Sequence, residues 1–321
     1  MHVVTRDHLE AAVTTLAGRV IRTPVLHAER LDDVAGRPVV AKAEALQLTG
    51  SFKVRGAMNR IATLSQQQRD AGLITISAGN AALGAAHAAR EFGADLVVVM
   101  PENAVPEKLE AVRRYGATVV NQGITSAAVA FERAAALKAE RGLTLVHPFD
   151  DPMVIAGAGT ATLELLEDHP DIEQLFVPCS GGGLLAGAAA AVAALRASVE
   201  VIGVQPEGNN GFVLSLAAGD PVGPATVATI ADGLTAPKPG ALNLEIVRTA
   251  SARIITVSDR QILDAMALIA RTLRVVVEPA GATALAGLLS TDSRARSAVL
   301  LSGSNVNWKL LAEELTPQVV A

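Results

Sequence analysis

Short aliphatic and β-branched runs alternate with alanine- and leucine-rich stretches along most of the chain. Strands that are apolar throughout and separated by helices are typical of parallel sheets covered on both faces, so this alternation predicts an α/β fold. The predicted strands lie within residues 73–77, 94–101, 117–123, 172–180, 199–206 and 297–305. In such sheets ligands bind beyond the carboxyl ends of the strands, where each loop leads into a helix. These loops are therefore the first candidates for a functional site.

One of these loops has the composition of an anion-binding site. The strand within 172–180 is followed by "SGGGLLAG", and a helix is expected to begin near Leu184. Glycines allow several backbone amides to converge on one phosphate, and the start of a helix contributes partial positive charge. The run has neither the Gly-Lys-Ser/Thr of a P-loop nor the spacing of a dinucleotide-binding motif. A tight turn without a ligand is the alternative, but the position between a buried strand and a helix favours phosphate.

Two further loops follow the same plan, in "TISAGNAAL" and "LLSGSNVNW". In the first, Ser77, Gly79 and Asn80 could hold a carboxylate with backbone amides and short polar side chains. In the second, Ser302 and Asn305 follow the predicted strand. Taken separately, each loop is more simply explained by a residue that caps the following helix.

A lysine in "LTGSFKVRGAMNR", residues 48–60, is hard to explain as a surface residue. Lys53 is expected at the beginning of a helix, where the helix dipole disfavours a cation. That position and partial burial would lower the pKa of the amine, which eases imine formation and proton abstraction. An amine, a phosphate cradle and a carboxylate cradle together suit pyridoxal phosphate, an aldehyde cofactor that needs a lysine partner.

The composition argues against several classes of protein. A net charge of −5, a pI near 5.7 and 2% aromatic residues disfavour nucleic acid as a partner. No apolar run reaches the roughly 18 residues of a membrane-spanning helix, and residues 1–20 lack the regions of a signal peptide. The only cysteine, Cys179, excludes an internal disulfide and fits the reducing cytoplasm. A cytoplasmic protein that binds a small molecule, without nucleic acid or membrane as partner, is therefore expected.

Other reactive side chains have simpler explanations. Cys179 is expected to be a buried strand residue, because nothing nearby marks it as a nucleophile. The histidines show no metal-ligand spacing, and "HPFDDP" at 147–152 favours a turn over a pair of catalytic carboxylates. The remaining lysines are expected to be solvated side chains, namely Lys42, Lys108, Lys138, Lys238 and Lys309.

Nearly the whole chain carries motifs of one enzyme family. They are, in order, "RTPVL", "LTGSFKVRGAMNR", "SAGNAALGAAHAAREFGA", "VVMPENAVPEKLEAVRRYGA", "HPFDDPMVIAGAGT", "VPCSGGGLLAG", "VIGVQPEG", "TIADGL", "EPAGA" and "LLSGSNVN". In this order they resemble the fold-type II pyridoxal-phosphate enzymes, and among these the serine/threonine dehydratases (threonine ammonia-lyase-like). The resemblance implies a tryptophan synthase beta-like fold, with two domains that each contain a mainly parallel sheet flanked by helices.

The same resemblance implies a domain division, a cofactor and a set of site residues. A large cofactor-binding domain would comprise residues 1–64 and 148–321, a small mobile domain would comprise 65–147, and the protein would be a homodimer. Lys53 would be the Schiff-base partner of pyridoxal 5'-phosphate and the catalytic acid/base. The cofactor-binding residues would be Phe52, Lys53, Asn80, Ser180, Gly181, Gly182, Gly183, Leu184, Glu278 and Ser302. The substrate carboxylate would be bound by Ser77, Gly79, Asn80 and Ala81.

Three of these assignments bear on the chemistry. Residues 180–184 would surround the phosphate, Asn80 would bind the ring hydroxyl, and Ser302 would face the ring nitrogen with Glu278 nearby. A serine hydroxyl cannot stabilise a charged ring nitrogen as a carboxylate does, so the ring is a weaker electron sink and β-elimination is favoured. The resemblance thus implies an ammonia-lyase (dehydratase) of amino-acid catabolism. It would remove water from a β-hydroxy amino acid, such as threonine, serine or a related analogue, to give a 2-oxo acid and ammonia.

The sequence departs from the family pattern at three places. Ala78 stands where racemases of the family carry a serine as a second acid/base, which favours a lyase. Ala81 and Leu83 replace the His and Gln usual in "SAGNHAQG", which predicts a more apolar site and a larger or less polar substrate. Gln205 and Gly211 stand at positions that are acidic in metal-dependent relatives, so no divalent-metal site is expected there.

Two alternatives stay open. The same scaffold and cofactor also serve amino-acid racemases and β-replacement synthases. A protein that only binds a phosphorylated ligand would retain the three loops, but it would leave the position of Lys53 unexplained.

Overall fold

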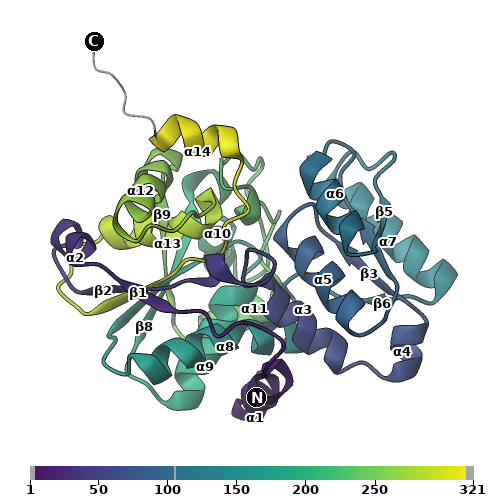
Figure 1. The fold of residues 1–321 in the computed structure, drawn as a ribbon, viewed down its shortest axis with the longest axis horizontal. Helices are drawn as coiled ribbons and strands as arrows, with labels where there is room; N and C mark the ends of the chain where they lie inside the picture. The colour runs from purple at the N-terminus through teal and green to yellow at the C-terminus, as the bar shows by residue number, and fades with distance from the viewer. Residues whose placement is uncertain (1–3, 105, 316–321) are drawn as a thin grey trace.

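The protein is built from two sheets, each of which lies between helices (Figure 1). The computed structural model describes residues 4–104 and 106–315. Within these residues no helix is both long enough and apolar enough to cross a membrane. The prediction of an α/β fold with two mainly parallel sheets is confirmed.

The larger sheet has six strands in the order β1-β2-β10-β7-β8-β9. β1 is antiparallel to β2, and the other neighbouring strands are parallel. The strands are β1 (Val25–His27), β2 (Val39–Lys42), β7 (Gln174–Pro178), β8 (Glu200–Pro206), β9 (Arg253–Val257) and β10 (Ser297–Leu300). Strands from the beginning and the end of the chain therefore pair within one sheet.

Helices cover both faces of the larger sheet, which explains why its inner strands are mostly apolar. Leu175 and Val177 of β7 point into one core, whereas Phe176 between them points into the other. The first core is completed by α1 (Arg6–Leu16), α8 (Pro152–Asp168), α9 (Gly183–Leu195), α10 (Gly211–Ala218) and α11 (Ala241–Thr249). The second is completed by α2 (Glu29–Ala35), α12 (Asp259–Thr272), α13 (Pro279–Leu289) and α14 (Trp308–Leu315).

The smaller sheet has four parallel strands in the order β5-β4-β3-β6. They are β3 (Leu73–Ile76), β4 (Leu96–Val99), β5 (Thr118–Val120) and β6 (Thr144–Leu145). α3 (Lys53–Ala62), α5 (Asn80–Glu91) and α6 (Pro106–Arg114) contribute to the core on one face, and α7 (Ala127–Arg141) covers the other. The short α4 (Gln66–Asp70) leads into β3, and α3 lies where the two sheets approach each other (Figure 1).

The topology brings three loops to one place. β7 and β10 are neighbours in the larger sheet, so the loops that follow them lie side by side. The loop after β3 comes from the smaller sheet and leads directly into α5. Three short 3-10 helices complete the described chain, η1 (Glu44–Leu46), η2 (Glu207–Asn209) and η3 (Asp232–Leu234).

Candidate functional site

A cavity of about 870 Å³ lies where β3, β7 and β10 end. All the residues that the sequence predicted for the site line this cavity: Phe52, Lys53, Ser77, Gly79, Asn80, Ala81, Ser180, Gly181, Gly182, Gly183, Leu184, Glu278 and Ser302. They come from distant segments of the chain, and only the fold brings them together. The roles of the individual residues stay predictions.

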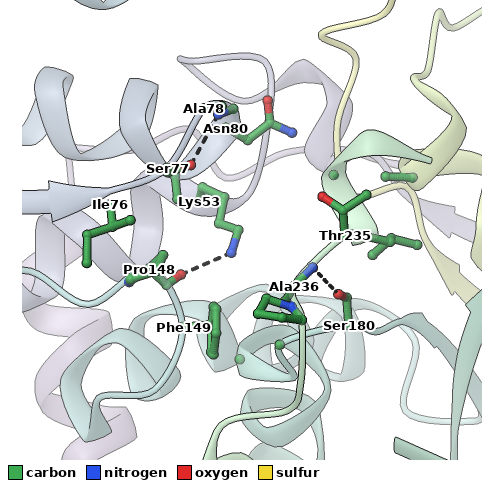
Figure 2. Close-up of a pocket in the computed structure, with 18 of the residues that line it drawn as sticks. Lys53, Ile76, Ser77, Ala78, Asn80, Pro148, Phe149, Ser180, Thr235 and Ala236 are labelled. Carbon is green, nitrogen blue, oxygen red and sulfur yellow. Dashed lines mark hydrogen bonds between the residues drawn. The ribbon is translucent and has the colours of Figure 1, made fainter. Parts of the chain in front are cut away.

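Lys53 is the first residue of α3 and projects into the cavity (Figure 2). Its Nζ donates a hydrogen bond to the carbonyl of Pro148 at 3.0 Å. The amine also lies 5.2 Å from the ring centre of Phe52 and 5.9 Å from that of Phe149. Burial lowers the pKa of Lys53 to about 8, with a smaller opposing contribution from Glu278. The side chain is therefore a nucleophile or base much closer to neutral pH than an ordinary lysine.

The glycine loop, residues 180–184, connects β7 to α9. Gly182 has a φ of +100°, and α9 begins at Gly183. A Cβ atom on Gly181 would lie 2.6 Å from the ring of Phe149, and one on Gly182 would lie 2.5 Å from the ring of Phe212. The loop therefore requires glycine. The first backbone amides of α9 have no carbonyl acceptor one turn earlier, so they could bind an anion.

Two buried asparagines form hydrogen bonds with the glycine loop. Asn243 donates a hydrogen bond from Nδ2 to the carbonyl of Gly181 at 2.8 Å. Asn209 donates from Nδ2 to Ser180 Oγ at 3.3 Å and to the carbonyl of Ala236 at 3.0 Å. The backbone amide of Ala236 in turn donates to Ser180 Oγ at 2.9 Å (Figure 2). Sequence reasoning missed both asparagines, because neither lies in a motif that indicates a long-range contact.

The loop after β3 forms the part of the cavity wall that belongs to the smaller sheet. Ser77 Oγ accepts a hydrogen bond from the backbone amide of Gly79 at 3.1 Å, and α5 begins at Asn80. Ala81 lines the cavity, whereas Leu83 belongs to the core between α3, α5 and the sheet. The expectation that Leu83 makes the site more apolar is therefore wrong, and of this pair only Ala81 lines the cavity.

The loop after β10 and the start of α13 form the third wall. Ser302 is buried, and its Oγ makes one long hydrogen bond, 3.4 Å, to the carbonyl of Ala280. Glu278 directly precedes α13 and accepts a hydrogen bond from Asn80 Nδ2 at 2.5 Å. Asn305 donates from Nδ2 to Asn80 Oδ1 at 2.7 Å. Burial is the main cause that raises the pKa of Glu278 to about 7.

Of the lysines expected to be solvated, Lys42 is buried, which contradicts the expectation, whereas Lys108 is partly exposed but paired. Lys42 is completely buried, and its Nζ donates to Glu164 Oε2 at 2.6 Å and to the carbonyl of Thr23 at 2.7 Å. A buried ammonium group needs such a partner, and the sequence around Lys42 does not show one. Lys108 lines the cavity and forms an ion pair with Asp232, which connects α6 of the smaller sheet to η3.

The "HPFDDP" run is a turn, as predicted. His147 Nδ1 accepts hydrogen bonds from the backbone amides of Phe149 and Asp150 at 3.3 and 2.8 Å. Asp150 accepts from backbone amides at the start of α11, and Asp151 caps α8. Both carboxylates are therefore used to hold helix ends.

The predicted absence of a divalent metal after β8 stays a prediction. Gln205 is buried, and its Oε1 accepts hydrogen bonds from the backbone amides of Phe212 and Val213 at 3.1 and 3.3 Å. Among residues 4–104 and 106–315, no group of three or more His, Cys, Asp or Glu side chains is placed to hold a metal ion. Cys179 is buried, and burial raises the pKa of its thiol, so it is an inert residue as expected.

Comparisons with known proteins agree with this geometry. The family model described as pyridoxal-phosphate dependent enzyme matches residues 16–303. L-threonine ammonia-lyase of Thermotoga maritima is 38% identical over 310 residues, which cover 96% of this chain and 77% of that protein. The solved structure of a threonine deaminase from T.th. matches with a TM-score of 0.89 at 41% identity, over 94% of this chain and 99% of that one. Maize serine racemase matches with a TM-score of 0.93 at 35% identity, over 98% of this chain and 97% of that one.

Proposed function

Because this chain belongs to the pyridoxal-phosphate dependent enzymes, we propose that it is an ammonia-lyase (dehydratase) that acts on a β-hydroxy amino acid. The substrate would be threonine, serine or a related analogue, and the products would be a 2-oxo acid and ammonia. The observation that carries this proposal is the amine of Lys53. Its pKa is about 8, and it shares one cavity with the glycine loop and Ser302.

The residues present fit pyridoxal 5'-phosphate. The glycine loop and the start of α9 would hold the phosphate, since close packing behind Gly181 and Gly182 leaves their backbone as the cavity surface. Lys53 would hold the aldehyde end, and Ser302 Oγ, which has only one long hydrogen bond, would reach the ring nitrogen. When bound, the cofactor supplies an aldehyde that combines with amines and a ring that withdraws electrons from the substrate Cα.

The chain's own residues would then direct the reaction. The backbone amides after Ser77 and at the start of α5 would bind the substrate carboxylate. Lys53, as an unprotonated amine, would remove the proton from Cα. Ser302 offers a neutral hydroxyl rather than a carboxylate and so would not stabilise a charged ring nitrogen, which favours elimination. The β-hydroxyl would leave as water with a proton equivalent to the one that Lys53 takes from Cα.

A racemase or β-replacement synthase on the same scaffold is the second candidate. The similarity to maize serine racemase supports it, since the two chains share their fold over nearly their whole length. Racemisation needs proton donors on both faces of Cα, and Ala78, which lines the cavity beside Ser77, provides none (Figure 2). Incubation with L-serine and L-threonine should therefore yield 2-oxo acid and ammonia, with little D-isomer. A dominant D-isomer would favour the racemase instead.

Replacement of Lys53 by alanine tests the proposal directly. We expect ammonia release from L-threonine and L-serine to fall by a factor on the order of 10³ or more, because both the covalent partner and the base are lost. The yellow colour of the purified protein should disappear as well. In the wild type, borohydride reduction followed by peptide mass spectrometry should locate a pyridoxyl group on Lys53.

Lys138→Ala is the matched control, because Lys138 is an exposed residue of α7 outside the cavity. It should leave colour and turnover unchanged. If the Lys53→Ala variant retained turnover, the proposed function would be wrong.

We also propose a domain organisation, an oligomeric state and a location. Residues 65–147, which contain the whole smaller sheet, would form a small domain that moves toward residues 1–64 and 148–321 and excludes water from the cavity. A homodimer is proposed from the family resemblance and is tested by light scattering of the purified protein. The cytoplasm is proposed because the only cysteine is buried Cys179, so the fold needs no oxidising compartment.

A further inference from the structure

We propose that Glu278 and Asn305 are positioning residues, which orient the Asn80 amide so that its nitrogen donates a hydrogen bond to the ring oxygen of the cofactor. This inference rests on the proposed function and specifies how one part of that site is held. The three residues come from the start of α5, the start of α13 and the loop after β10. Their contact therefore depends on the whole fold.

Two hydrogen bonds determine which way the Asn80 amide faces. Asn80 Oδ1 accepts from Asn305 Nδ2 at 2.7 Å, and Asn80 Nδ2 donates to Glu278 Oε1 at 2.5 Å. If the amide were turned over, its nitrogen would face another NH2 group and its oxygen would face a carboxylate. Asn305 is itself held by a second hydrogen bond, from Nδ2 to the carbonyl of Thr49 at 2.9 Å.

The fixed orientation leaves one N–H of the Asn80 amide without a partner among these residues. An amide nitrogen has two hydrogens, and only one of them is used by Glu278. Asn80 lies at the edge of the cavity beside Ser77 and Ala78 (Figure 2), so its second N–H is available to an acceptor there. Because the amide cannot turn over, it can offer only a hydrogen-bond donor to the ring oxygen. A donor stabilises the deprotonated oxygen more than the hydroxyl. Asn80 would therefore stabilise the deprotonated ring oxygen.

Glu278 makes this arrangement dependent on pH. The carboxyl group is buried, and its pKa is raised to about 7, first by burial and then by Asp232. The groups that oppose this rise are Asn80 of α5, Lys108 of α6 and Lys53 of α3. Above pH 7 the charged carboxylate accepts strongly from Asn80, whereas below pH 7 the neutral acid accepts weakly and the amide is less firmly held.

The first test is a pH titration of the holoenzyme, followed by the absorbance of the bound cofactor. In the wild type we expect a spectral change with a midpoint near pH 7, because the protonation of the ring oxygen follows the state of Glu278. Glu278→Gln can still accept from Asn80 but has no charge to titrate, so this component of the change should vanish while the cofactor stays bound. Glu207→Gln, an exposed residue of η2 outside the cavity, is the matched control and should titrate like the wild type.

The second test reverses the amide. Asn305→Asp replaces the donor that faces Asn80 Oδ1 with an acceptor, so Asn80 should turn over and lose its N–H toward the cavity. We expect the cofactor absorbance to shift toward the protonated form and kcat with L-threonine to fall roughly 10- to 100-fold, with KM little changed. Asn307→Asp makes the same exchange two residues away, where Oδ1 accepts from the amide of Lys309, and should change neither quantity.

The outcomes separate this inference from the proposed function. If Glu278→Gln and Asn305→Asp retain the wild-type spectrum, titration and kcat, the positioning role is wrong even though the enzyme binds its cofactor. If Glu278→Gln does not fold, Asn305→Asp alone tests the positioning role, and a wild-type spectrum and kcat in that variant would show that the role is wrong. A wild-type protein that shows no cofactor absorbance after supplementation would instead overturn the proposed function.

Discussion

Residues 180–184 and 77–81 form opposite sides of the cavity and have the same plan, a strand followed by a loop and the start of a helix (Figure 2). Their surroundings differ. A Cβ atom on Gly182 would lie 2.5 Å from Phe212, whereas one on Gly79 would meet nothing within 4 Å. Residues 180–184 are buried and residues 77–81 are partly exposed. One loop is therefore held by its neighbours, and the other has room to shift.

This difference fits the two ligands of the proposed enzyme. A phosphate that stays bound through every turnover is best held by a rigid, preorganised set of amides. A substrate that enters and leaves needs a loop that can open and close around its carboxylate. The comparison therefore predicts that substitutions in the glycine loop affect cofactor binding, whereas substitutions in the loop after β3 affect the substrate.

Among substitutions in these two loops, the largest expected effect comes from Gly182→Ala. The new methyl group would clash with Phe212 and Asn243, and the φ of +100° would be strained for any residue with a side chain. We expect a loss of about 3 kcal/mol in the free energy of unfolding, measured by urea denaturation. Cofactor affinity, measured by absorbance titration, should fall roughly 100-fold.

Gly219→Ala is a control that separates the two causes of the Gly182→Ala effect, the steric clash and the strained φ. Gly219 has a φ of +84° at the end of α10, but a Cβ atom there would meet nothing within 4 Å. It should cost only about 1 kcal/mol of stability and leave cofactor affinity unchanged. Equal effects of the two substitutions would show that packing behind the glycine loop is unimportant.

The amine between the two loops gives a pH dependence. The pKa of Lys53 is lowered to about 8, so the unprotonated fraction falls about tenfold for each pH unit well below that value. Capture of pyridoxal phosphate by the apoprotein should slow accordingly between about pH 8 and pH 6.5. A phosphate ester of the same ring without the aldehyde depends on the glycine loop alone. Its affinity should change less over this range. A parallel loss would mean that the pH dependence comes from phosphate binding at the glycine loop and not from Lys53.

Ser77→Ala tests the loop after β3. Ser77 Oγ accepts a hydrogen bond from the amide of Gly79 at 3.1 Å and so helps to order the loop. Its removal should raise KM for L-threonine by roughly three- to tenfold, the loss of about one hydrogen bond, without a change in the absorbance of the bound cofactor. Ser65→Ala removes a cap from α4 away from the cavity and should lower stability but not change KM. A loss of cofactor from Ser77→Ala would contradict the division of roles.

The features that local sequence predicts are those that depend on a few consecutive residues. The strands β3, β4, β7, β8 and β10 are mostly apolar because both of their faces are buried. The glycine loop and the start of α3 at Lys53 follow from turn and helix chemistry within a few positions. β9 was not among the predicted strands, since it is an edge strand and its residues are only partly buried.

The features that were missed depend on residues far apart along the chain. Lys42 is buried because Glu164, 122 positions away, accepts its hydrogen bond. Asn209 and Asn243 support the glycine loop from segments that no local motif connects to it. Leu83 was expected in the cavity because of its place in a motif, but the helical period turns it into the core. Such contacts can be identified only from the three-dimensional arrangement of the chain.

The smallest expected effect, and the most direct check on the freedom of the loop after β3, comes from Gly79→Ala. Its φ of −135° is accessible to alanine, and the added methyl group meets no neighbour within 4 Å. We therefore expect the free energy of unfolding to change by less than about 1 kcal/mol and cofactor affinity to change by less than about twofold. A loss of cofactor as severe as that of Gly182→Ala would show that the two loops are packed equally tightly. In that case the cofactor and the substrate could not be assigned to opposite sides of the cavity on the basis of rigidity.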